Sequence, residues 1–187
     1  MGTSTPADPG GFVVWFEGLS GSGKTTLSRS TAAQLRALGW KVEVLDGDEM
    51  RRVFSPDLGF SRRDREAHAR RVSYMAHLLA RNGVAAMVAM ITPYETSRQA
   101  ARSEVGLRFE EVYLQCPLEV CRQRDPKGIY RRNEEGSVHQ LTGIDDPFEE
   151  PLNPELTVDT AATTVDQATR RIVDHLRARG LIHAPVG

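Results

Sequence analysis

The segment Gly18-Leu-Ser-Gly-Ser-Gly-Lys-Thr25 decides the fold of this 187-residue chain. It fits the pattern G-x-x-x-x-G-K-[ST], in which glycines let backbone N–H groups close around phosphate oxygens. Residues 12–16 before it form a short apolar run typical of a buried strand, and residues 26–38 after it have helical spacing of apolar side chains. A strand, a glycine-rich loop and a helix in this order predict a binding site for a nucleoside triphosphate.

The positions of this loop have distinct expected roles. Lys24 is expected to neutralise β- and γ-phosphate oxygens of ATP, and the Thr25 hydroxyl to ligate Mg²⁺. The helix that follows directs the positive end of its dipole at the same anion. The positions predicted to bind ATP in this loop are Gly18, Ser20, Gly21, Ser22, Gly23, Lys24, Thr25 and Thr26.

The rest of the chain alternates strand and helix patterns. Strands are predicted at residues 12–16, 41–45, 84–91, 109–115 and 156–159. This alternation predicts an α/β fold of the P-loop nucleoside triphosphate hydrolase type, with a parallel sheet between two layers of helices. Residues 50–62 are predicted to be irregular. The polar stretch 125–154 is too long for a plain connection and predicts a mobile lid. We expect a flexible tail at 1–11 and a single domain at 12–187.

Composition excludes several classes of protein. Lys and Arg number 24 against 25 Asp and Glu, which argues against a protein that coats nucleic acid. The longest apolar run has eight residues, whereas a membrane helix needs about twenty. Cys116 and Cys121 are too sparse for a zinc site or a disulfide framework, and residues 1–11 do not resemble a signal peptide. A cytoplasmic protein with no nucleic-acid or membrane partner is expected.

Two carboxylates follow the second predicted strand, in Asp46-Gly47-Asp48. In a parallel α/β sheet this end faces the ligand. We assign Asp48 as the candidate base for an acceptor hydroxyl and Asp46 to the magnesium shell. No acid follows the third strand, so a GTPase or AAA-type ATPase is not favoured. Thr92 stands there, either positioning a phosphate or bonding the backbone.

Cationic side chains and one aromatic ring complete the predicted site. The arginines nearest Asp48 are suited to clamp an anionic acceptor. Phe60 is suited either to stack on a base or to pack in the core. In the segment 125–154 and just before it, Arg124 and Lys127 are the cations expected to close over the phosphates.

Taken together, these motifs resemble the adenylylsulfate kinase family over about residues 12–180. Besides the phosphate-binding loop, the matching segments are Leu45-Asp-Gly-Asp48 with Arg51, Leu58-Gly-Phe-Ser61 with Asp64-Arg-Glu66 and Arg70-Arg71, Ile91-Thr-Pro-Tyr94, Arg124-Asp-Pro-Lys-Gly-Ile-Tyr130, and Thr142-Gly-Ile-Asp-Asp146. The resemblance implies transfer of the γ-phosphate of ATP to the 3′-hydroxyl of adenosine 5′-phosphosulfate (APS), giving PAPS in sulfate assimilation. It also implies a homodimer.

The same resemblance implies an acceptor site. Arg51 and Arg65 would hold the charged tail of APS, Phe60 would stack on its base, and Lys127 would arrive with the lid. The implied acceptor-binding residues are Asp48, Arg51, Phe60, Arg65, His68, Ile91, Thr92, Lys127, His139 and Leu141.

Three of these positions depart from the family pattern. His68 replaces the usual asparagine, His139 a lysine, and Leu141 a phenylalanine that would clamp adenine. These departures leave open a relative that phosphorylates another nucleotide, such as cytidine diphosphoramidate in capsule modification. A nucleotide-binding regulatory protein without transfer, and a shikimate- or gluconate-type kinase, are further alternatives.

Overall fold

The computed structural model describes residues 10–183, so the predicted tail at 1–11 lies almost entirely outside the described residues. Gly11 is already buried, and its carbonyl oxygen accepts a hydrogen bond from Arg108 Nε at 2.7 Å. The chain therefore joins the packed structure just before the first strand.

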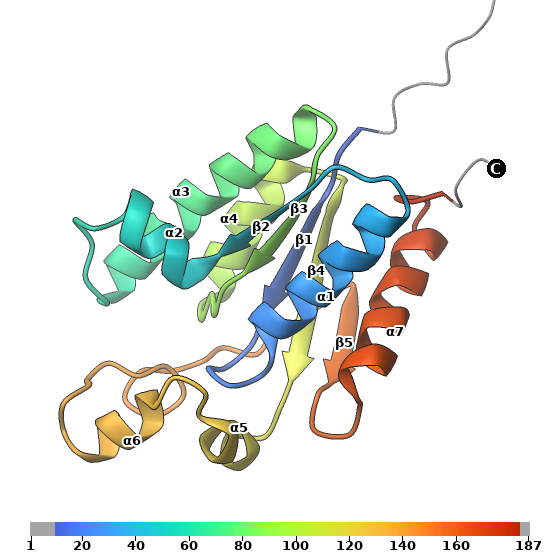
Figure 1. Cartoon of the computed structure of the whole chain (residues 1–187). Coiled ribbons are helices and arrows are strands. Elements are labelled where there is room, and N and C mark those ends of the chain that lie inside the picture. The colour runs from blue at the N-terminus through green and yellow to red at the C-terminus, as the bar shows by residue number, and fades with distance from the viewer. Residues whose placement is uncertain (1–9, 184–187) are drawn as a thin grey trace, which may run out of the picture.

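Five parallel strands form the centre of the molecule in the order β2-β3-β1-β4-β5 (Figure 1). This sheet confirms the predicted α/β fold, and each predicted strand is present within two residues of its expected bounds. The strands are β1 (Val13–Glu17), β2 (Val42–Asp46), β3 (Ala85–Ala89), β4 (Phe109–Gln115) and β5 (Leu156–Asp159).

Helices cover both faces of the sheet because side chains alternate along each strand. Val14 and Phe16 pack in one core with α1 (Lys24–Ala37) and α7 (Val165–Ala178). Val13 and Trp15 pack in a second core with α3 (Arg62–Arg81) and α4 (Glu95–Val105). The result is the predicted three-layer arrangement (Figure 1).

The prediction that residues 50–62 are irregular is wrong for its first part, because α2 (Gly47–Phe54) is helical. Asp46 caps this helix by accepting a hydrogen bond from the Asp48 backbone N–H at 3.1 Å. Only Met50 of the helix is buried, so no apolar stripe marks it in the sequence. The Asp-Gly-Asp motif is therefore a helix start rather than a turn.

The 125–154 segment lies beyond the carboxyl ends of the strands, after α5 (Leu118–Arg124), and contains α6 (Ile129–Glu134) (Figure 1). The Tyr130 hydroxyl donates a hydrogen bond to the Ser20 carbonyl at 2.9 Å, which joins this segment to the phosphate-binding loop. Its mobility stays a prediction. Among residues 10–183, no helix is long and apolar enough to cross a membrane.

Candidate active site

A cavity of about 1340 Å³ runs along the carboxyl edge of the sheet. In open α/β sheets this edge is where ligands bind, because loops from successive strands meet there. All the residues predicted from the sequence except Gly18 line it. They are Ser20, Gly21, Ser22, Gly23, Lys24, Thr25, Thr26, Asp46, Asp48, Arg51, Phe60, Arg65, His68, Ile91, Thr92, Arg124, Lys127, His139 and Leu141.

The phosphate-binding loop is shaped to receive an anion. Gly23 precedes α1 with a φ of 99°, in the left-handed region that favours glycine, and no side chain caps the helix there. In a helix without such a cap the first backbone N–H groups have no intrahelical partner, and the first residues of α1, Lys24, Thr25 and Thr26, line the cavity. Backbone donors and the helix dipole together suit a phosphate group.

Lys24 folds over this loop, where its Nζ donates to the carbonyl oxygens of Gly18 at 2.9 Å and Leu19 at 2.6 Å. Burial, reinforced by the nearby Lys127, lowers the pKa of Lys24 to about 8. Before a phosphate binds, the charged form of Lys24 is therefore only modestly favoured over the neutral form at neutral pH.

We therefore expect kcat/KM for ATP to fall as the pH rises through about 8, because Lys24 loses its proton in the free enzyme. Steady-state kinetics between about pH 6 and pH 10 measure this. Lys24→Arg is the matched control, because arginine stays charged over this range. We expect this variant to have a lower kcat/KM whose value does not fall at alkaline pH. A wild-type profile that stays level above pH 9 would contradict the expectation.

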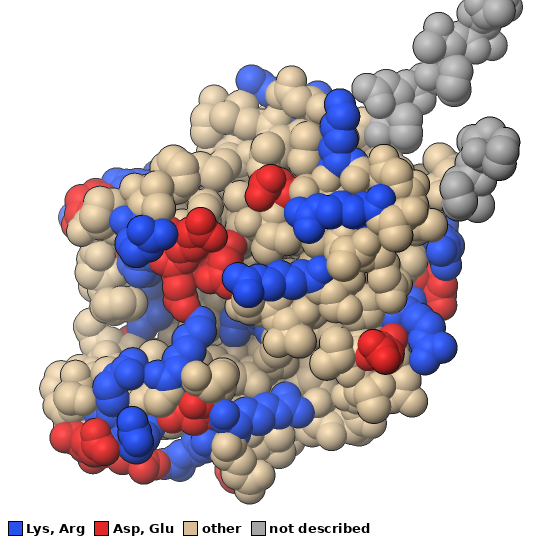
Figure 2. All heavy atoms as spheres, in the orientation of Figure 1, with Lys and Arg blue, Asp and Glu red and all other residues tan. Residues whose placement is uncertain are grey.

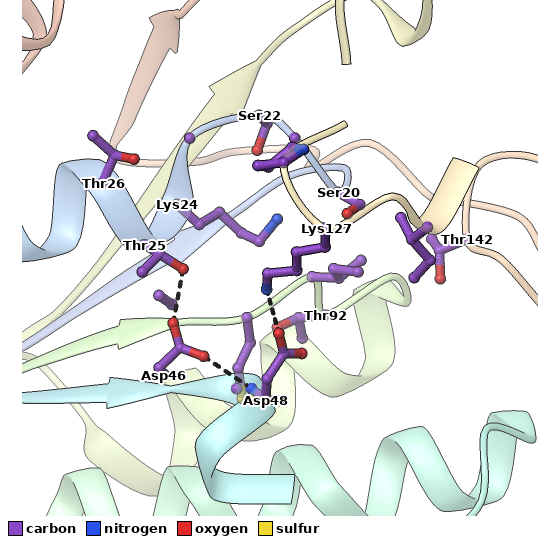
Figure 3. A pocket seen from close by; sticks show the side chains of 18 of the residues that line it. Ser20, Ser22, Lys24, Thr25, Thr26, Asp46, Asp48, Thr92, Lys127 and Thr142 are labelled. Atoms are coloured by element: carbon purple, nitrogen blue, oxygen red, sulfur yellow. Dashed lines mark hydrogen bonds and ion pairs between the residues drawn. The ribbon is translucent and has the colours of Figure 1, made fainter. Parts of the chain in front are cut away.

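A chain of contacts joins the loop to the two aspartates (Figure 3). Thr25 Oγ1 donates to Asp46 Oδ2 at 2.7 Å, while Asp46 Oδ1 accepts from the Asp48 backbone. Lys127 Nζ forms an ion pair with Asp48 Oδ2. Thr25 and Asp46 present adjacent hard oxygen donors beside the phosphate-binding loop, and this donor set fits Mg²⁺.

Phe60 lines the cavity and is 51% exposed, which rules out the core-packing alternative. The guanidinium carbons of Arg51 and Arg65 lie 4.9 and 5.6 Å from its ring centroid. Arg51 Nη1 also donates to the Gly59 carbonyl at 2.8 Å. An exposed ring flanked by two cations is suited to hold a base that carries an anionic tail.

Arg65 has contacts that the sequence did not suggest. Its Nε donates to the Phe60 carbonyl at 2.8 Å, and its Nη2 donates to the Gln140 carbonyl at 2.5 Å and lies 3.4 Å from Asp146 Oδ2. This guanidinium therefore joins α3 to the 125–154 segment as well as flanking the ring.

His68 is only 2% exposed, and both of its ring nitrogens have protein partners. Nε2 lies 3.3 Å from the Gly47 carbonyl, and Nδ1 lies 2.9 Å from Ser55 Oγ. Because a carbonyl only accepts, Nε2 carries the hydrogen and Nδ1 accepts from Ser55. Burial and the Arg51 charge lower the pKa of His68 to about 4, so the ring is neutral and braces α2 against α3.

The other two departures from the family pattern differ in setting. His139 is exposed at the cavity, whereas Leu141 is 4% exposed and packs with Cys116, Cys121 and Tyr130. Both cysteines are free and buried.

Sequence reasoning missed part of the cavity. At the end opposite Phe60, Arg124 Nη2 donates to the Thr160 carbonyl at 2.6 Å. Thr160, Thr163 and Thr164 line the same end. These residues follow β5 directly, so the rule that ligands bind beyond the strands' carboxyl ends could have found them.

Comparison with known proteins identifies the family. The model of the adenylylsulphate kinase family matches residues 10–159. The chain belongs to this family. An adenylyl-sulfate kinase from Synechococcus sp. (strain JA-3-3Ab) is 48% identical over 172 residues, covering 92% of this chain and 97% of that protein. A probable adenylyl-sulfate kinase from Pyrococcus abyssi is 48% identical over 172 residues, covering 92% of this chain and 98% of that protein.

A solved structure extends this similarity to three dimensions. The Mycobacterium tuberculosis APS kinase, in complex with AMPPNP and APS, superposes with a TM-score of 0.87 at 39% identity. The superposition covers 90% of this chain and 99% of that one. The kinase resemblance inferred from the motifs is thus confirmed.

Proposed function

We propose that this kinase transfers the γ-phosphate of ATP to the 3′-hydroxyl of APS, giving PAPS and ADP. One observation carries the proposal: a single cavity holds the phosphate-binding loop, the Asp48 carboxylate and the Arg51–Phe60–Arg65 set. The adenylyl-sulfate kinases named above, and the relative solved with APS and AMPPNP, support this acceptor over a cytidine nucleotide.

The donor end binds ATP. Backbone N–H groups of the loop and the Lys24 ammonium neutralise the phosphates, and Arg124 contacts the nucleotide near Thr160. Thr25 and Asp46 would hold Mg²⁺, which when bound offsets charge on the β- and γ-phosphate oxygens.

The acceptor end binds APS. The exposed face of Phe60 stacks on the adenine, and Arg51 and Arg65 bind the phosphosulfate oxygens. Arg65 also contacts the 125–154 segment, so a movement of that segment would shift the residue that binds the anion.

The donor end and the acceptor end of the cavity meet at Asp48, where the phosphoryl group is transferred. The acceptor oxygen forms a bond to the γ-phosphorus, the bond from that phosphorus to the β–γ bridging oxygen breaks, and ADP leaves. Asp48 takes the proton of the 3′-hydroxyl. Lys127, now paired with Asp48, moves onto phosphate oxygens as the substrates bind, which frees the carboxylate.

We further infer that the enzyme needs Mg²⁺, acts as a homodimer, works in the cytoplasm and closes the 125–154 segment as a lid. Retention of Lys24, Thr25, Asp46 and Asp48 around one cavity favours transfer over nucleotide binding alone.

The proposal is tested by ADP release from Mg-ATP with APS, compared with cytidine diphosphate derivatives at equal low concentration. We expect turnover that depends on APS and stops when Mg²⁺ is chelated. Turnover with a cytidine acceptor but not with APS would replace the proposed acceptor, and ATP binding without any transfer would remove the enzymatic function.

A further inference from the structure

The carboxylate of Asp125 lies between α5 and α6 and binds three consecutive backbone N–H groups. Oδ1 accepts from Ile129 at 2.8 Å and from Tyr130 at 3.3 Å, and Oδ2 accepts from Arg131 at 3.2 Å. These are the first three residues of α6, and the Gly128 before them supplies no side-chain cap. One charged side chain therefore satisfies the N–H groups at which this short helix begins.

The backbone of Asp125 closes the loop that leads to α6. Its N–H continues the hydrogen bonding of α5, and its carbonyl accepts from the Gly128 N–H at 3.0 Å. Only Pro126 and Lys127 lie between these two residues, and the proline ring fixes one of the backbone angles. The Lys127 carbonyl also accepts from Arg132 Nη1 at 3.0 Å. The backbone of Lys127 is thus held from both sides.

This held loop presents its lysine to the cavity. Lys127 lines the cavity and forms an ion pair with Asp48 (Figure 3), whereas Asp125 does not line it. Tyr130, which is 2% exposed, ties α6 to the phosphate-binding loop through the Ser20 carbonyl. Figure 2 shows basic side chains gathered over α6, opposite an acidic patch over α2. The loop therefore aims a cation at the place where the phosphates and the base meet.

We propose that Asp125 is a positioning residue for phosphoryl transfer, because its carboxylate fixes the loop from which the Lys127 ammonium reaches the phosphoryl group in transit. The inference rests on the proposed function and deepens it. A lysine carries its charge on a flexible four-carbon stem, so the protein aims this charge by fixing the backbone beneath it. A displacement of about 1 Å can cost about 10²-fold in rate. Asp125 itself touches no substrate and exchanges no proton.

The first test compares Asp125→Ala, which removes both acceptor oxygens, with Asp125→Asn, which keeps one. We expect Asp125→Ala to lower kcat about tenfold and to leave both KM values within about twofold of wild type, because Lys127 acts on charge that develops during transfer. Asp125→Asn should recover kcat to within about threefold of wild type, since asparagine caps helices nearly as well as aspartate. Wild-type kcat in Asp125→Ala, or equal losses in both variants, overturns the inference.

Glu134→Gln is the matched control for the loss of an acid from this region. Glu134 is exposed, belongs to α6 and joins it to α5 through an ion pair with Arg122. Its carboxylate bonds this guanidinium rather than the start of the helix, and it does not line the cavity. The control should keep wild-type kcat. A loss equal to that of Asp125→Ala would assign the effect to the general stability of α6 and overturn the inference.

The second test asks whether Asp125 acts through Lys127. Lys127→Met removes the ammonium at similar length and is expected to lower kcat about 10²-fold. Asp125→Ala should cost about tenfold in the wild-type background and less than about twofold in the Lys127→Met background, because a positioning residue has no effect once the group it positions is gone. An equal loss from Asp125→Ala in both backgrounds overturns the positioning role.

Amide hydrogen exchange examines the loop without any turnover. In ¹⁵N NMR spectra of the substrate-free protein, the N–H groups of Ile129, Tyr130 and Arg131 should exchange about tenfold faster in Asp125→Ala than in wild type, and at the wild-type rate in Glu134→Gln. Unchanged exchange in Asp125→Ala overturns the inference. Absence of APS turnover in the wild-type protein, by contrast, contradicts the proposed function and leaves the fixing of the loop to be judged by this measurement.

Discussion

Asp48→Asn is expected to lower kcat with APS by about 10²–10⁴-fold, the usual contribution of a general base. The amide matches the carboxylate in shape but cannot take the proton of the 3′-hydroxyl. In the structure the Asp48 side chain is 72% exposed to the cavity and reaches Lys127, so no core packing depends on its charge. The change should therefore appear in kcat, measured by ADP release, while binding of ATP is retained.

Asp57→Asn is the matched control for this variant. Asp57 is also an exposed aspartate that pairs with a cation, Arg71, but it does not line the cavity. The control should keep wild-type kcat. If Asp48→Asn turns over within about threefold of wild type, the base is another group and the proposed proton transfer is wrong.

Arg98→Met is expected to cost about 3–5 kcal/mol of unfolding free energy, since it removes a fully buried cation from among carboxylates. Arg98 lies 2.6 Å from Glu95 Oε2, 3.3 Å from Glu111 Oε1 and 3.4 Å from Glu17 Oε2. Without it these acids face one another with little water. For a chain of this size the loss corresponds to a decrease in Tm of about 6–20 °C, measurable by calorimetry.

Glu17→Gln tests the role of charge in this cluster, because glutamine has nearly the same volume as glutamate. Burial, and the neighbouring Glu111, raise the pKa of Glu17 from 4.5 to about 10, so the carboxyl is protonated at neutral pH and glutamine imitates it. We expect the Tm of this variant to match wild type only below about pH 4.5, where the wild-type carboxyl is protonated in both the folded and the unfolded states.

The difference in stability between Glu17→Gln and wild type is expected to depend on pH. Because the folded-state pKa is the higher one, the stabilising contribution of the protonated carboxyl is complete below pH 4.5 and is lost as the pH rises towards 10. Glu17→Gln should gain stability relative to wild type over that range. A Tm of Arg98→Met within about 2 °C of wild type, or a Glu17→Gln difference that is constant with pH, would contradict this account of the cluster.

Local sequence determined the sheet, most helices and the donor half of the site. The phosphate-binding loop needs glycine at positions such as Gly23, and its lysine and threonine follow at fixed spacing, so neighbouring residues suffice to specify it. The cap of α3 is equally local, because Ser61 Oγ accepts a hydrogen bond from the N–H of Asp64, three residues further on, at 3.2 Å. The helix α2 was not predicted, because its cap resembles a turn and only Met50 among its residues is buried.

Only the tertiary structure decided which polar groups meet across the chain. The sequence singled out Thr92 and His68 but not their partners Trp15 and Gly47, which lie 77 and 21 residues away. Nor did it mark Arg98 as buried among three acids. Helical and strand periodicity records which face of an element is covered, but the partner of a buried donor or charge depends on how separate elements pack. For that reason the sequence determined the phosphate-binding loop, whereas the fold determined which group the Thr92 hydroxyl contacts.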